Sequence, residues 1–361
     1  MKKIFFITAI ILFFFAFSLS IFRADALSIV PTHADRTKVK KGCGGCHIPH
    51  KGKGPSLLEK EREMSCAKCH DAVIEKKVKT DDIGDGKNPK DVYTSIRKSS
   101  NHPVLTTTKY HKFGEVLPET DITTPRHAAC FDCHNAHVLT TDDKFKGLEG
   151  VTVAGSKKIK RMKISNESEI CYKCHGDSAN LPANQKNKRL EFLPANASYH
   201  PVEDVGKRTT VPSLRKPLTI SSTITCSDCH GDDDQQAAKG PHGSNFAPIL
   251  RYNYATDDNQ PESYYRYESC YRCHDRNSIL ADESFKVTNS SAQLRGHNYH
   301  IVTAKTSCYA CHNSHGSARY KDLIDFDKTI VVPNQNGRLD YVHEGNVITC
   351  YLKCHNKQHG L

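Results

Sequence analysis

Tryptophan is absent from this chain of 361 residues, and methionine occurs only three times. Mean hydropathy is −0.59, which leaves little apolar material for a large polypeptide core. After residue 26 no apolar stretch is long enough to span a bilayer. These absences argue against a conventional globular interior and against a membrane domain beyond the N-terminal segment. Something other than side chains must fill much of the interior.

Residues 1–26 predict a secretory signal. Lys2 and Lys3 form a basic start, an apolar run follows, and Ala24-Asp25-Ala26 reads as a cleavage site. The apolar run is nearly long enough for an uncleaved membrane anchor, which is the alternative. Either interpretation implies an exported protein.

All sixteen cysteines belong to eight motifs in which a histidine directly follows the second cysteine. Seven motifs read C-x-x-C-H, and the eighth, at residues 350–355, has one more residue between its cysteines. Zinc sites and thioredoxin-like pairs also use C-x-x-C, but neither requires that histidine. The motifs therefore indicate eight covalently attached c-type haems. Their cysteines are Cys43, Cys46, Cys66, Cys69, Cys130, Cys133, Cys171, Cys174, Cys226, Cys229, Cys270, Cys273, Cys308, Cys311, Cys350 and Cys354.

The histidine of each motif is placed to bind the haem iron from one side. These eight proximal candidates are His47, His70, His134, His175, His230, His274, His312 and His355. About 42 residues remain per haem if 335 mature residues serve eight sites, so the haems themselves would form most of the apolar interior. We expect mostly irregular chain with short helices at the motifs and little β-structure, such as short strands at residues 151–153 and 328–332.

An internal repeat supplies candidates for the second axial ligand. Each unit has a histidine, often followed by Pro-Val or Ile-Val, then a haem motif, a second histidine and another haem motif. The repeat selects His33, His50, His102, His137, His200, His242, His300 and His315. Only Met64 and Met162 could act as sulfur ligands after residue 26, and we expect neither to do so. The histidines outside the repeat, interpreted as surface or propionate-bonding residues, are His111, His127, His297, His343 and His359, although His297 competes with His300.

The repeat divides the mature chain into four di-haem modules. Their expected bounds are residues 27–98, 99–190, 191–290 and 291–361. The net charge of +11 falls to +9 without the first 26 residues. Eight ferric haems with sixteen propionates bring the net charge to roughly +1. The excess of basic residues therefore offsets the propionate charges and does not indicate nucleic-acid binding.

C-x-x-C-H-x-x-H at residues 43–50, 130–137 and 308–315, each followed by a plain haem motif, resembles the doubled-motif multihaem cytochromes c. The His-Pro-Val elements and Gly240-Pro241-His242-Gly243 are similar to those of respiratory cytochromes from metal-reducing bacteria. The longer eighth motif and the displaced His242 depart from the common pattern. The resemblance implies a haem wire in the periplasm or at the cell surface.

The resulting hypothesis is an eight-haem electron carrier with no catalytic residue, because two histidines per iron leave no open coordination position. Its partners would be donor and acceptor redox proteins. The alternatives are an octahaem enzyme acting on a small nitrogen or sulfur compound at one open haem, and a filament subunit. In the filament, His33 could ligate a haem of the next copy.

Overall fold

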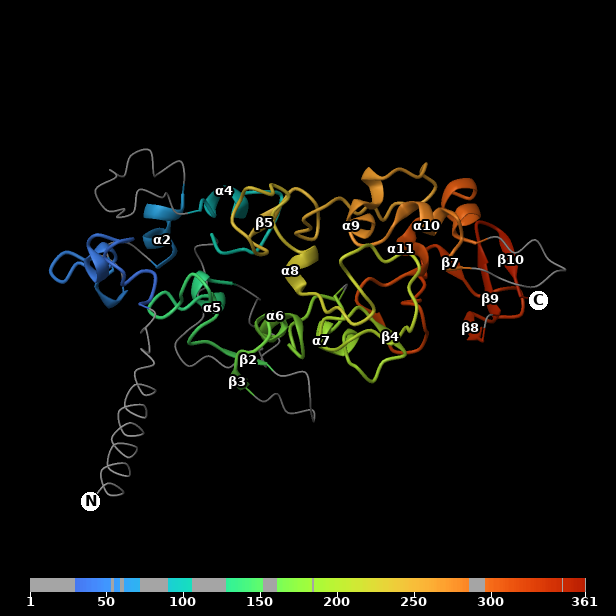
Figure 1. Cartoon of the computed structure of the whole chain (residues 1–361), viewed down its shortest axis with the longest axis horizontal. Helices are drawn as coiled ribbons and strands as arrows, with labels where there is room; N and C mark the ends of the chain where they lie inside the picture. The colour runs from blue at the N-terminus through green and yellow to red at the C-terminus, as the bar shows by residue number, and fades with distance from the viewer. Residues whose placement is uncertain are drawn as a thin grey trace, which may run out of the picture.

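The computed structural model describes residues 30–52, 55–58, 62–71, 90–105, 128–151, 161–183, 185–285, 296–345 and 347–360. The expected signal at residues 1–26 lies outside this part of the chain, as do His111 and His127. Among the described residues, no helix has both the length and the apolar character needed to cross a membrane. The molecule is elongated, with α2 near one end and β8, β9 and β10 at the other (Figure 1).

The α-helices are short, as expected for a chain punctuated by haem motifs. They are α2 (Arg62–His70), α4 (Tyr93–Ile96), α5 (Cys130–Cys133), α6 (Ser168–His175), α7 (Lys188–Glu191), α8 (Cys226–Cys229), α9 (Glu268–Tyr271), α10 (Arg276–Leu280) and α11 (Cys308–Cys311). Other helical turns are η1 (Gly42–Gly45), η2 (Pro55–Leu57), η4 (Tyr265–Tyr267) and the π-helical η5 (Tyr299–Thr303).

The strands are brief everywhere except near the C-terminus. They are β1 (Ser100–Asn101), β2 (Glu149–Val151), β3 (Arg161–Lys163), β4 (Ser198–Tyr199), β5 (Gly243–Ser244), β6 (Gly316–Ser317), β7 (Val331–Val332), β8 (Asp340–Glu344), β9 (Val347–Cys354) and β10 (Lys357–His359). The antiparallel pairs β1–β5, β2–β3 and β4–β6 are separate, whereas β9 pairs with β7, β8 and β10. The strand expected at residues 151–153 overlaps β2 at residue 151, and residues 152–153 lie outside the described part of the chain; of the strand expected at residues 328–332, only Val331 and Val332 form a strand, β7.

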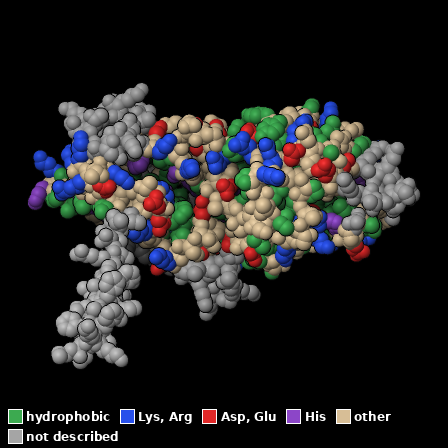
Figure 2. All heavy atoms as spheres, in the orientation of Figure 1, with side chains coloured by type: hydrophobic (Ala, Val, Ile, Leu, Met, Phe, Trp, Pro, Cys, Tyr) green, Lys and Arg blue, Asp and Glu red, His purple; other side chains and the backbone are tan. Residues whose placement is uncertain are grey.

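The apolar core is divided into small clusters. The largest lies on the C-terminal sheet and contains Ile324, Phe326, Val331, Tyr341 and Leu352, with Cys311, Cys350 and Cys354 packed against it. The other three clusters contain three buried residues each. On the face shown in Figure 2, basic and acidic side chains are interspersed along the molecule. The described chain thus forms a series of small packed regions, as expected if haems occupy the spaces between them.

Candidate haem sites

The C-x-x-C-H motifs share one local geometry. In five of them the histidine backbone N–H donates to the carbonyl of the first cysteine over 2.8–2.9 Å, and these histidines are His47, His134, His230, His274 and His312. His70 and His175 instead close the longer helices α2 and α6. A single helical turn brings both thiols to one side of the chain beside the imidazole. All sixteen thiols are free of disulfides, as thioether attachment requires.

Eight pairs of histidine rings lie with their centroids 6.1–6.4 Å apart, at interplanar angles from 16° to 74°. The pairs are His47–His137, His33–His70, His134–His242, His102–His175, His230–His315, His200–His274, His297–His312 and His300–His359. A metal–imidazole bond is about 2 Å long and the ring centroid lies about 1 Å further back, so two axial imidazoles have centroids roughly 6 Å apart. The donor set and its spacing therefore fit one bis-histidine iron per pair.

The second ring nitrogen of most paired histidines is held by a hydrogen bond. For the motif histidines, Nδ1 bonds to backbone oxygens or a hydroxyl over 2.9–3.3 Å. The partners are Ser56 for His47, Lys90 for His70, Lys144 for His134, Pro248 for His230, Ser213 for His274 and Asp322 for His312. A carbonyl can only accept, so it fixes a proton on Nδ1 and leaves Nε2 free for a metal.

A second set of contacts recurs four times. In each, the Nδ1–H of one histidine donates to the backbone carbonyl of the residue directly before another histidine of the pairs. The donors and acceptors are His33 to Ala136, His102 to Pro241, His200 to Ser314 and His300 to Gly296. The following histidines are His137, His242, His315 and His297. Each contact therefore connects histidines of two neighbouring pairs.

Short strand pairs hold two of these contacts. β1 pairs with β5 next to His102 and His242, and β4 pairs with β6 next to His200 and His315. Both pairs need a glycine, because a Cβ on Gly243 would lie 1.9 Å from the Ser95 carbonyl oxygen and one on Gly316 would lie 2.1 Å from that of Glu191. The glycine after the histidine is therefore a requirement of close backbone approach.

A histidine that follows the first haem motif of one repeat pairs with the motif histidine of the preceding repeat. His137, which follows the third motif, faces His47 of the first motif. His242 follows the fifth motif and faces His134 of the third, and His315 follows the seventh and faces His230 of the fifth. His50 has the same position after the first motif. In the structure it is exposed and lies against no ring among the described residues.

Cysteines of successive motifs lie next to each other. The ligand atoms of Glu167, Cys171 and Cys226 are within 4.8 Å of one another, which joins the fourth motif to the fifth. Burial and, after it, the nearby thiols of Cys273 and Cys270 raise the pKa of Cys229 to about 12, which places the fifth motif beside the sixth. A hydrogen bond to Cys270 raises the pKa of Cys308, which places the sixth motif beside the seventh. Burial and then Cys350 and Cys354 raise the pKa of Cys311 to about 12. The motifs from the fourth to the eighth are thus adjacent in chain order.

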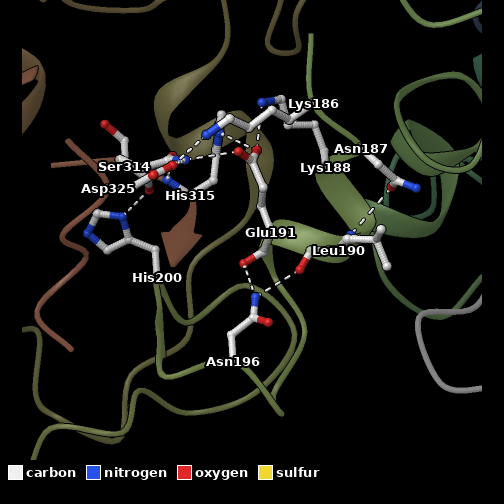
Figure 3. A network of polar contacts seen from close by, with 11 residues as sticks. Lys186, Asn187, Lys188, Leu190, Glu191, Asn196, His200, Ser314, His315 and Asp325 are labelled. Atoms are coloured by element: carbon white, nitrogen blue, oxygen red, sulfur yellow. Dashed lines mark hydrogen bonds and ion pairs between the residues drawn. The ribbon is translucent and has the colours of Figure 1, made fainter. Parts of the chain in front are cut away.

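One ligand has a carboxylate partner (Figure 3). His315 Nδ1 lies 3.2 Å from Glu191 Oε2, and Lys188 Nζ donates to the same oxygen over 2.6 Å. Asn313 Nδ2 donates to Oε1 over 2.9 Å. Burial alone would raise the pKa of Glu191, but the hydrogen bonds from His315, Lys188 and Asn313 lower it to about 2. This carboxylate is therefore a fixed negative charge beside the His315 imidazole.

The placements differ from the expected ligand set at four histidines, of which the exposed His50 is one. His297 and His359, interpreted from sequence as surface residues, face His312 and His300. His355 instead directs Nε2 to Asp258 Oδ2 at 2.5 Å. His343, in β8, was interpreted as a surface or propionate-bonding residue; its side chain is only 10 % exposed, contacts Asp322 and Tyr341, and lies outside the eight pairs. The spacing of His297 one helical turn before His300 was the available signal for its placement.

Two parts of the sequence match known families. Residues 37–75 match the doubled CXXCH motif family, and residues 154–323 match the family of MtrC/MtrF-like outer membrane cytochromes, domains II/IV. The chain is a multihaem c-type cytochrome. It is similar to the cytochromes of metal-reducing bacteria. No curated protein and no solved structure matches it.

The matches cover different parts of this cytochrome. The doubled-motif match spans the first two haem motifs, and the MtrC/MtrF-like match spans the fourth to the seventh. The third and eighth motifs lie outside both, so their haem sites depend on the cysteine spacing and the histidine pairs.

Proposed function

We propose that this cytochrome carries electrons along eight bis-histidine haems arranged in four di-haem modules. The observation that supports this most directly is the set of eight histidine pairs at a common spacing of 6.1–6.4 Å. When bound, each haem supplies one-electron iron chemistry. The protein holds the axial nitrogens, fixes their tautomers and brings neighbouring sites together.

The order of the sites along the wire follows the order of the motifs over most of the chain. From the fourth motif to the eighth, a cysteine of each motif lies close to a cysteine of the next. Contacts from His33 and His137 connect the first three sites at the other end. An elongated molecule with sites in this order would accept electrons at one end and release them at the other (Figure 1).

A transport role is favoured over catalysis because every one of the eight pairs supplies two nitrogens, which leaves no iron open to a small substrate. A filament joined by an exchanged histidine is not needed to complete any pair, since His33 faces His70 of the same chain. The partners would be donor and acceptor redox proteins. The outer-membrane name of the matching family supports export to the cell surface.

Quantified low-temperature EPR of the oxidised protein, set against a pyridine haemochrome count, tests this proposal. Eight haems per chain, all low-spin, are expected. Fewer than eight haems would contradict the octahaem assignment, and a high-spin haem in the wild-type protein would point to the catalytic alternative.

A further inference from the structure

The eighth motif is built on a strand, whereas the other seven lie on helical turns. Cys350 and Cys354 belong to β9, and the chain turns back directly into β10. The turn consists of His355 and Asn356, with φ of 47° and 62°. Positive φ at both central residues is the property of the type I′ turns that close two-residue hairpins. The motif with one more residue between its cysteines thus has a strand conformation in place of a helical turn. The histidine next to its second cysteine lies at the tip of the hairpin.

His355 uses the nitrogen that would be needed for iron. Its Nε2 contacts Asp258 Oδ2 at 2.5 Å, and the Asp258 side chain is only 10 % exposed. In the regular motifs a hydrogen bond engages Nδ1 and leaves Nε2 free, as at His312, where Nδ1 bonds the Asp322 carbonyl oxygen over 3.0 Å. His355 therefore has the opposite arrangement of its two nitrogens.

His359 lies on the haem side of the hairpin. Residues two apart along a strand share a face, so Cys350, Leu352 and Cys354 point the same way. In the β9–β10 register His359 is directly opposite Leu352, and cross-strand partners share a face. Its ring lies 6.2 Å from that of His300, a spacing within the range of the other seven pairs.

We propose that the haem attached at Cys350 and Cys354 is ligated by His300 and His359, and that His355 is a structural residue paired with Asp258. This inference rests on the proposed function, because it requires a haem at the eighth site. The ligand motif would then read C-x-x-x-C-H-x-x-x-H, with the iron ligand delivered by the second strand of a hairpin.

The test is a His359→Ala variant of the full chain, measured by EPR and by haem count. We expect eight covalent haems, with one of the eight converted from low-spin to high-spin and restored by added imidazole. His300→Ala is the positive control, since it removes the other proposed ligand of the same iron. His343→Ala is the negative control, because this histidine of the adjacent strand β8 contacts Asp322 and Tyr341 and lies outside the eight pairs.

A His359→Met variant guards against loss of folding in the alanine variant. Methionine ligation at one haem would add the far-red methionine–iron charge-transfer band, with the haem count unchanged. If His359→Ala stays fully low-spin and His359→Met lacks that band, the inference is overturned and His355 is the ligand. A wild-type count of seven haems, with none on Cys350 and Cys354, would instead show that the proposed function fails at this site.

Discussion

Replacing Glu191 by glutamine should raise the reduction potential of one haem, the one that we propose His230 and His315 to ligate. The carboxylate accepts the Nδ1 proton of His315 over 3.2 Å and is 9 % exposed. Such a partner makes the imidazole a stronger donor to iron and so favours the ferric state. Glutamine keeps the size and an acceptor oxygen but removes the charge.

The size of the shift follows from the contact. A hydrogen bond to a charged group is worth about 1.5–3 kcal/mol. Glutamine would retain a neutral bond, and Lys188 at 2.6 Å already offsets part of the charge, so about 1 kcal/mol of ferric stabilisation should be lost. A tenfold change in a one-electron equilibrium corresponds to 59 mV, which gives an upward shift of roughly 40 mV.

Lys188→Met provides a test of the sign. It removes the positive charge beside Glu191 while keeping the length of the side chain, so it should lower the same potential. Spectroelectrochemical titration combined with EPR of the haems in partly reduced samples would measure both. An unchanged set of potentials in Glu191→Gln, or shifts of the same direction in both variants, would refute the electrostatic explanation.

Three further predictions concern the scaffold. Gly243→Ala would place a Cβ 1.9 Å from the Ser95 carbonyl oxygen and should displace His102 and His242 together, so that EPR shows two high-spin haems. Gly206→Ala is the control and should give no high-spin haem, because no atom lies within 4 Å of the Cβ that it adds. His50→Ala should leave the EPR spectrum and haem count of the isolated protein unchanged, and a new high-spin haem would contradict the observed pairing. Glu262→Gln should lower the free energy of unfolding by about 2 kcal/mol at neutral pH, because it removes the charge of a carboxylate that is 4 % exposed and lies 2.5 Å from Arg276; Asp257→Asn, at a carboxylate that is 60 % exposed, is the control. The Arg276 hydrogen bond lowers the pKa of Glu262, so its stabilisation is present above the ordinary value of 4.5 and lost as pH falls through the lower folded value; melting curves of wild type and variant should converge in that acid range.

The sequence alone located every thiol and seven of the motif histidines that the structure pairs. In the seven C-x-x-C-H motifs attachment is a local property, since two thiols and an imidazole lie on one helical turn, and the spacing of the motif indicates that turn. The expectation of short helices, loops and few strands holds for the same reason, because each of these seven motifs needs only a short helical segment, such as the four-residue α5, α8 or α11. The four-module division remains a proposal that the fourfold histidine contact supports.

Only the tertiary structure decided which histidines meet. His47 and His137 are 90 residues apart in the chain, and nothing between them encodes their approach. His50, His137 and His315 occupy the same motif position, yet among the described residues only His137 and His315 are paired with another histidine. His359 could not be distinguished from a surface histidine, because its direction is set by the register of β10 against β9. Local spacing determines where a haem is attached, whereas long-range strand pairing and backbone contacts determine the second ligand of its iron.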